Sequence, residues 1–214
     1  MSPAFYSLVS GKIAWRLLCT VVLCSASIIF FDGPVARLFA DSVLHHQQRQ
    51  YAVGAGILLT PLIVAGIVSG ILILRGHAAS LEKRTLFLGS ASAIVSFVLN
   101  NLLLKPIFGR GVVDVFLYYP SQYGFSPFHG GWGFSFPSGH MAIVSAFISV
   151  MWRNFPRGYP FYVAFLGFTA VVLLVGEWHF VSDLIAGAFW GNMIAIIVMD
   201  AYGSLTATVK RNRD

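Results

Sequence analysis

The sequence is short of charge. Of its 214 residues, only 10% are Asp, Glu, Lys or Arg, while 57% are hydrophobic, and the mean hydropathy is +0.77. A soluble domain carries about 25% charged residues. This shortage excludes an ordinary water-soluble globular domain and favours a chain that lies mostly in lipid.

Cysteine is also scarce. The two cysteines, Cys19 and Cys24, both lie inside the first apolar run. Two thiols inside one membrane segment do not form a disulfide framework, so they indicate nothing about the redox compartment. We interpret both as packing residues.

The chain lacks the sequence signatures of a nucleotide, dinucleotide or zinc site. His45 and His46 are adjacent, but no carboxylate or third histidine stands at ligand spacing, so we interpret Asp32–Gln50 as a polar connector. We therefore expect no metal and no cofactor. The net charge of +6 does not indicate a nucleic-acid partner, because the basic residues lie between apolar runs rather than on a tail.

Apolar runs long enough to cross the bilayer recur along the whole chain. Each must be a helix, because a helix satisfies its own backbone polar groups in lipid. The fold class is therefore predicted to be all-α, a polytopic membrane helical bundle in which residues 1–214 form a single domain. We expect about six spans: Ile13–Phe31, Tyr51–Leu74, Thr85–Leu104, Gly139–Trp152, Tyr159–Glu177 and Asp183–Tyr202.

The basic residues predict the orientation of these spans, since Lys and Arg accumulate on the cytoplasmic side. Ten lie on one side: Lys12, Arg16, Arg75, Lys83, Arg84, Arg153, Arg157, Lys210, Arg211 and Arg213. Four lie on the other: Arg37, Arg49, Lys105 and Arg110. We therefore expect both termini in the cytoplasm, a retained signal anchor as the first span, and an extracytoplasmic active-site loop over residues 105–137. A bacterial inner membrane fits this layout.

Ionisable side chains near the ends of spans are functional candidates, because they are costly there. Three polar clusters fall on the predicted extracytoplasmic side: Lys105–Arg110, Phe136–His140 and Glu177–Asp183. The predicted topology brings all three to one membrane face, although they lie far apart in the sequence.

Two of these clusters are suited to holding a phosphate. Lys105 and Arg110 can neutralise phosphate oxygens. The backbone N–H groups around Ser138 and Gly139, at the start of a predicted helix, point donors and a positive dipole end towards an anion. We expect these four residues to bind phosphate.

The same clusters hold two histidines and a carboxylate. His179 and Asp183 are four apart, so they share a face if the last helix begins by His179. Asp183 then holds one imidazole nitrogen, and the other nitrogen is free to act as a nucleophile. His140 is on another helix, where it can act as a general acid. Covalent histidine chemistry without a metal is the simplest interpretation.

At these residues the chain resembles the type-2 phosphatidic acid phosphatase superfamily of membrane lipid phosphatases. The family pattern is Lys, six residues, Arg-Pro; then Pro-Ser-Gly-His; then Ser-Arg, five residues, His, three residues, Asp. The second element is matched in full by Pro137–His140, and the third by His179 and Asp183. The resemblance implies that His179 is the phosphorylated nucleophile, Asp183 its orienting partner and His140 the acid.

The chain departs from this pattern at two arginines. The family's Arg-Pro falls on Val112-Val113, and its Ser-Arg falls on Val172-Leu173. We expect Arg110 to substitute in part, with help from His129 or the amides of Gly130 and Gly131.

The predicted function is hydrolysis of a lipid phosphate or diphosphate at the extracytoplasmic face. Phosphotransfer to a second lipid, and a lipid-phosphate binder without turnover, remain alternatives, and a transporter is a third. The sequence names neither the lipid nor an oligomeric state.

Overall fold

The computed structural model describes residues 3–40, 51–75 and 80–211. Within these ranges the chain is helical and has no β-strand, only an isolated bridge between Arg110 and Phe125. The main helices are α1 (Pro3–Phe30), α2 (Asp32–Leu38), α3 (Tyr51–Leu74), α4 (Leu81–Leu99), α5 (Lys105–Phe108), α6 (Val113–Tyr118), α7 (Gly139–Asn154), α8 (Tyr159–Val175) and α9 (Val181–Arg211). The all-α prediction is confirmed. His45 and His46 of the predicted connector lie outside the described residues.

Four helices in the described ranges are long and apolar enough to cross a membrane. They are Ile13–Phe30, Leu81–Phe108, Pro156–Val175 and Val181–Ser204. The apolar stretch Leu59–Ile73 of α3 is shorter, and α7 has 16 residues. At 1.5 Å per residue α7 is about 24 Å long, less than the roughly 30 Å of hydrocarbon. The predicted count of about six spans is therefore not confirmed.

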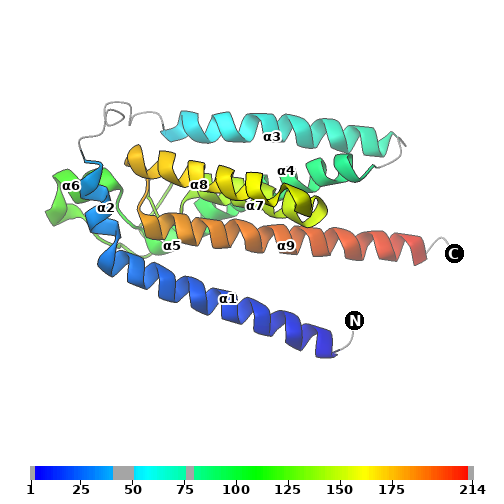
Figure 1. Ribbon diagram of the computed structural model, residues 1–214, viewed down its shortest axis with the longest axis horizontal. Coiled ribbons are helices and arrows are strands. Elements are labelled where there is room, and N and C mark those ends of the chain that lie inside the picture. The colour runs from blue at the N-terminus through cyan, green and yellow to red at the C-terminus, as the bar shows by residue number, and fades with distance from the viewer. Residues whose placement is uncertain (1–2, 41–50, 76–79, 212–214) are drawn as a thin grey trace.

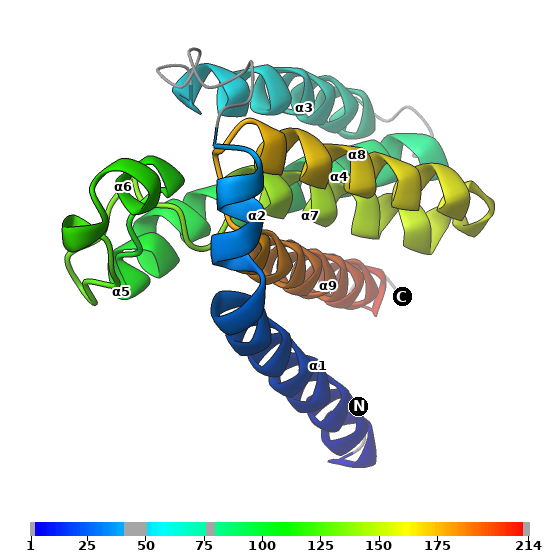
Figure 2. The same ribbon diagram turned by 60° about the vertical axis from the view of Figure 1, so that its left-hand side comes forward.

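Helix α7 forms the centre of the bundle, where it packs against α4 and α9 (Figures 1 and 2). Two glycines of α9 lie close to α7. A Cβ at Gly187 would collide with the Ser138 backbone oxygen, and one at Gly191 with Ser145 Oγ and the Ala142 backbone oxygen. Both glycines therefore serve packing inside the protein, as their small-xxx-small spacing predicts.

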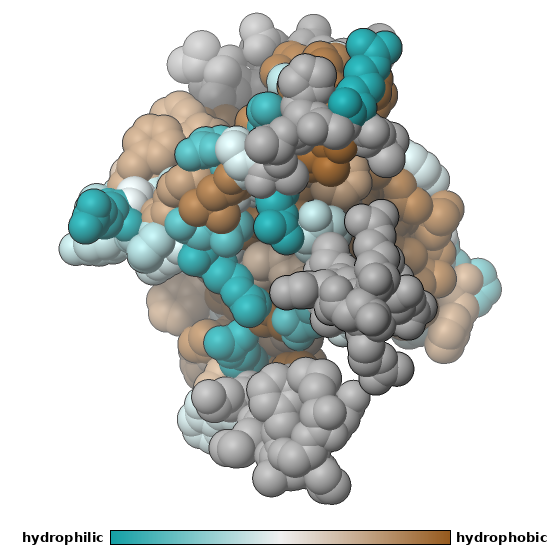
Figure 3. Space-filling view, turned by 90° about the vertical axis from the view of Figure 1, so that its right-hand side faces the viewer, coloured by the Kyte–Doolittle hydropathy of each residue, from teal (hydrophilic) through white to brown (hydrophobic). Residues whose placement is uncertain are grey.

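The two ends of the bundle are formed by different helices (Figure 1). The first turn of α1 and the last turn of α9 lie at one end, and α2, α5 and α6 lie at the other. Figure 3 looks onto the first end and shows hydrophilic side chains there, with hydrophobic residues beside them. Arg153 and Asp200 lie 3.9 Å apart, and Arg84 covers the Tyr202 ring. The three polar clusters lie at the opposite end from the first turn of α1 and the last turn of α9.

A π-helical turn, η2 (Asn100–Leu104), links α4 to α5. Such turns often occur at functional sites. The Asn100 side chain donates from Nδ2 to the Pro137 backbone oxygen at 3.1 Å. This bond ties the end of α4 to the segment that leads into α7.

Candidate active site

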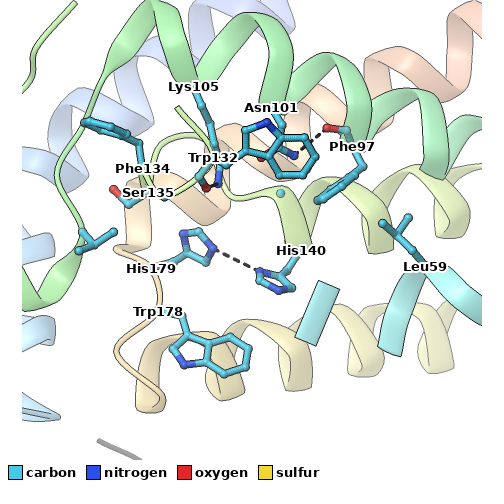
Figure 4. Close-up of a pocket in the computed structure, with 13 residues that line it drawn as sticks. Leu59, Phe97, Asn101, Lys105, Trp132, Phe134, Ser135, His140, Trp178 and His179 are labelled. Carbon is cyan, nitrogen blue, oxygen red and sulfur yellow. Dashed lines mark hydrogen bonds between the residues drawn. The ribbon is translucent and has the colours of Figure 1, made fainter. Parts of the chain in front are cut away.

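The three polar clusters meet around one cavity of about 470 Å³. Thirteen residues line it, and Figure 4 shows Lys105, His140 and His179 converging on the space between them. Gly139 also lines the cavity. The structure thus brings four of the seven predicted site residues to a common space, from three separate parts of the chain.

His179 and His140 lie next to each other in the wall of this cavity. His179 lies in the segment between α8 and α9, while His140 lies in the first turn of α7. The His179 Nε2 and His140 Nδ1 atoms are 3.5 Å apart (Figure 4). Both side chains are buried, so the two nitrogens form a pair shielded from bulk solvent.

The other nitrogen of His179 faces a carboxylate. His179 Nδ1 lies 3.4 Å from Asp183 Oδ2, which also accepts a hydrogen bond from the Phe180 backbone N–H at 2.9 Å. Helix α9 begins at Val181, so His179 precedes it and reaches Asp183 from the turn before the helix. Burial lowers the pKa of His179 below its usual value, and the Asp183 carboxylate opposes that shift. The net result favours the neutral imidazole, which is the form that acts as a nucleophile.

The start of α7 supplies backbone donors. Ser138 is the N-cap, and its Oγ accepts a hydrogen bond from the Met141 backbone N–H at 3.3 Å. Its own N–H donates to the Asp183 backbone oxygen at 3.0 Å. The Ser138 hydroxyl therefore caps α7, and the Ser138 N–H joins α7 to α9. The next residue, Gly139, lines the cavity. The positive end of the helix dipole at Gly139 favours an anion there.

Among the described residues that line this cavity, Lys105 is the only lysine or arginine. It is buried, and its Nζ donates to the Trp132 backbone oxygen at 3.2 Å. The surrounding loop folds tightly because Gly109 adopts a positive φ of 56°, and a Cβ there would collide with the Ser126 backbone. A Cβ on Gly130 would likewise collide with the Lys105 backbone oxygen. These two glycines hold the loop against Lys105.

Arg110 does not line the cavity. Its Nη1 donates to Asp183 Oδ1 at 2.7 Å and to Ser182 Oγ at 2.6 Å, and its Nη2 donates to Asp32 Oδ2 at 2.7 Å. Burial lowers the pKa of Arg110, but Asp183, Tyr123 and Asp32 together raise it by more than burial lowers it. The pKa of Arg110 therefore lies above its usual value. The guanidinium is therefore a permanent cation that is shared by two buried carboxylates.

Asp32 and Ser182 are site-adjacent residues that the sequence did not single out. Asp32 is the first residue of α2, just after the end of α1, and it is buried, although we expected it to begin a solvated or interfacial connector. The available signal was a carboxylate at the end of a span, but its partners are distant. The Ser182 backbone N–H, for example, donates to Asp32 Oδ1 across 150 residues of sequence.

The two positions where the family has arginines differ in surroundings. Val112 lines the cavity. Leu173 is buried and packs with Met141 and Leu184. His129 is exposed and is not among the lining residues, nor are Gly130 and Gly131.

In the part of the chain that the structure describes, no three His, Cys, Asp or Glu side chains form a group that could hold a metal ion. Metal independence of the reaction stays a prediction.

The chain is similar in sequence to a known family and to known proteins. A model of the PAP2 superfamily matches residues 84–206. A protein named lipid A 1-phosphatase from Rhizobium etli is 37% identical over 115 residues, which cover 52% of this chain and 47% of that protein. A protein of the same name from Rhizobium johnstonii is 33% identical over 205 residues, covering 84% of this chain and 78% of that protein.

No solved structure matches the chain significantly. The family and the two relatives support the prediction of a membrane lipid phosphatase. The residues that carry the resemblance, Pro137–His140, His179 and Asp183, all lie within the matched range. The chain belongs to the PAP2 superfamily.

Proposed function

We propose that this protein hydrolyses a lipid phosphate monoester or diphosphate through a phosphohistidine intermediate at the extracytoplasmic face of the inner membrane. One observation carries the proposal. His179 Nε2 and His140 Nδ1 lie 3.5 Å apart in a buried cavity that also holds the Lys105 ammonium. A nucleophile and a proton donor therefore face one space, next to a charge that attracts phosphate.

In the first step, neutral His179 attacks phosphorus with Nε2. The bond between phosphorus and the leaving oxygen breaks, and protonated His140 gives its proton to that oxygen. Asp183 holds Nδ1 and stabilises the positive charge that develops on the His179 ring. The lipid alcohol leaves, and the phosphoryl group stays on His179.

In the second step, a water molecule attacks the phosphohistidine. Neutral His140 takes a proton from this water, and the phosphorus–nitrogen bond breaks to release inorganic phosphate and neutral His179. Lys105 and the backbone N–H groups at the start of α7 stabilise the charge on the equatorial oxygens in both steps. A second lipid alcohol in place of water would give phosphotransfer by the same route.

The substrate class follows from the relatives and from the position of the cavity. Both relatives are named lipid A 1-phosphatase, so we propose a phosphate on the sugar headgroup of a glycolipid. Trp132 is largely exposed, packs edge-on against Phe97 and lines the cavity. Tryptophan favours the membrane interface. The phosphate can therefore enter the cavity while the acyl chains stay in lipid.

Phosphate release by purified protein tests this function. The substrates are lipid A, phosphatidate and a prenyl diphosphate in matched micelles, each with EDTA present. We expect release from lipid A at the highest rate. Activity lost with EDTA and restored by a divalent ion would remove the metal-free mechanism, and preference for another lipid would overturn the substrate class.

A lipid-phosphate binder without turnover is the second candidate. It is favoured by Val112 and Leu173, because each stands where the family has an arginine, and Lys105 is the only lysine or arginine among the described lining residues. Losing a charge-assisted contact to a transferring phosphoryl group costs on the order of a few kcal/mol of transition-state stabilisation. Saturable lipid A binding with no phosphate release in the same assay would establish this alternative.

A further inference from the structure

A buried ion network lies beside the cavity without lining it. Arg110 is 1% exposed, Asp32 3% and Asp183 0%. The guanidinium contacts both carboxylates at 2.7 Å through different nitrogens. Burying three charges is costly unless each is paired with good geometry, so this arrangement needs an explanation.

The two oxygens of Asp183 have separate partners. Oδ1 accepts from Arg110, while Oδ2 accepts from the Phe180 N–H and faces His179 Nδ1. Rotation of the carboxylate would break contacts on both sides. Arg110 thus holds Oδ1 of Asp183. This contact fixes the orientation of the carboxylate, so that Oδ2 points towards His179.

Asp32 holds Arg110 in turn. Its Oδ2 accepts from Arg110 Nη2 and from Ser182 Oγ at 2.5 Å, and its Oδ1 accepts from the Ser182 N–H at 3.0 Å and from Ser27 Oγ at 2.9 Å. All these partners are buried. Asp32 therefore ties the junction of α1 and α2 to the first turn of α9.

We propose that Arg110 and Asp32 are positioning residues that orient Asp183 towards His179 and balance its charge, rather than ligands of the substrate phosphate. This inference rests on the proposed function. A planar guanidinium bridges several acceptors at once, and a lysine ammonium cannot reproduce that geometry. The network also makes the junction of α1 and α2 part of the site, although the family match begins only at residue 84.

Charge balance shows what Asp32 contributes. Two carboxylates share one guanidinium, so the network carries one net negative charge next to His179. That charge stabilises the positive His179 ring of the transition state. Without the Asp32 charge, Arg110 is balanced by Asp183 alone. Asp183 then stabilises a cationic His179 less well.

Kinetics of two variants test this role, with Asp200→Asn as the control because Asp200 is an exposed carboxylate far from the site. Asp32→Asn and Arg110→Lys should each lower kcat on the order of tenfold or more, the size of a coupling between contacting residues, with little change in KM. Ser182→Ala removes only one hydroxyl and should lower kcat less. If Asp32→Asn or Arg110→Lys does not fold, Ser182→Ala still tests the proposed role. Unchanged kcat in a folded Asp32→Asn or Ser182→Ala protein would overturn the proposal.

Inhibition by inorganic phosphate separates positioning from phosphate binding. Lys105→Ala, which removes the lining cation, should raise the inhibition constant for phosphate. Arg110→Lys and Asp32→Asn should leave it within about twofold of the wild-type value, because neither side chain reaches the cavity. A rise in Arg110→Lys equal to that in Lys105→Ala would assign Arg110 to the phosphate instead.

Carbethoxylation of His179 gives a readout that does not need turnover. The reagent modifies neutral imidazole, and peptide mass spectrometry separates His179 from the other histidines. Three ionisable groups adjoin His179, namely Asp183, His140 and Lys105, and all are unchanged in Asp32→Asn. The pH midpoint of modification should move lower in Asp32→Asn than in Asp200→Asn. An unmoved midpoint would overturn the inference whether or not the protein releases phosphate, while the wild-type assay alone decides the proposed function.

Discussion

At the scale of single residues, each histidine of the cavity has a distinct neighbour. His179 has Asp183 behind it, whereas His140 packs against the Trp178 ring, with ring centroids 5.4 Å apart. Environment therefore distinguishes the two imidazoles, and opposite protonation states suit their proposed roles.

Removal of either imidazole tests these roles. His179→Ala should lower kcat by at least about a thousandfold, since no other group replaces the nucleophile, and His140→Ala nearly as much. His129→Ala is the matched control, because His129 is exposed and lies outside the cavity lining. Phosphate release by the three folded proteins is the measurement. A folded His179→Ala protein with most of its activity would refute the assignment.

The lowered pKa of His179 predicts the acidic limb of the pH profile. Protonation removes the nucleophile, and burial moves that protonation below the usual pKa of about 6.5. The rate of phosphate release should therefore stay constant as the pH falls through 6.5 and should decline only at lower pH. Asp183→Asn should move the limb lower still, because it removes the carboxylate that raises the pKa. Ionisation of the substrate affects the wild-type and Asp183→Asn profiles equally. If both profiles had the same acidic limb, the limb would not report the protonation of His179.

At the scale of helices, close packing of α7 on α9 sets the distance between the two histidine-bearing segments. Gly191→Ala should lower the free energy of unfolding by about 1–3 kcal/mol, since the added Cβ meets backbone atoms of α7 that cannot yield. Gly203→Ala lies in the same helix with nothing within 4 Å of its added Cβ. Both variants replace glycine by alanine within α9, so the change in helix propensity is the same in both. The difference between their thermal unfolding midpoints therefore measures the effect of packing. Equal stability of the two variants would show that α9 moves freely against α7.

Helix α8 bears the position where the family has its second arginine. Leu173→Arg should not restore activity, because the new cation would replace a 3% exposed side chain among Met141 and Leu184. A buried unpaired charge costs more than about 3 kcal/mol, so we expect loss of folded protein in size-exclusion chromatography. Val172→Arg is the control, since Val172 is 39% exposed on the same turn. A folded Leu173→Arg protein with a raised rate would show that α8 turns to admit the cation.

At the scale of the whole molecule, the first turn of α1 and the last turn of α9 lie at the opposite end of the bundle from α5 (Figure 1), whose Lys105 lines the cavity. A reporter fused after Asp214 should lie in the cytoplasm, and one inserted within 121–130 should lie on the other side. The physical reason is the excess of Lys and Arg beside the termini. Paired phosphatase and fluorescent-protein reporters measure both positions. The same side for both would contradict the predicted topology.

The sequence by itself determined the helices and the three polar clusters. Apolar runs specify helices because backbone groups in lipid must bond internally, and α3, α7 and α8 begin at the predicted residues. The residues of Pro137–His140, His179 and Asp183 were recognisable because their chemistry is concentrated in short runs. The count of about six spans stays a prediction, since α7 is apolar but has only 16 residues, most of which are buried.

Only the tertiary structure decided how the charges pair. Arg110 could be assigned to phosphate from its position next to Lys105, but its direction depends on Asp32 and Asp183, which lie 78 and 73 residues away. Local spacing carries no information about such contacts, because they form only when α1, α9 and the 105–137 loop meet. For the same reason the structure alone separated Val112, which lines the cavity, from Leu173, which packs in an apolar cluster.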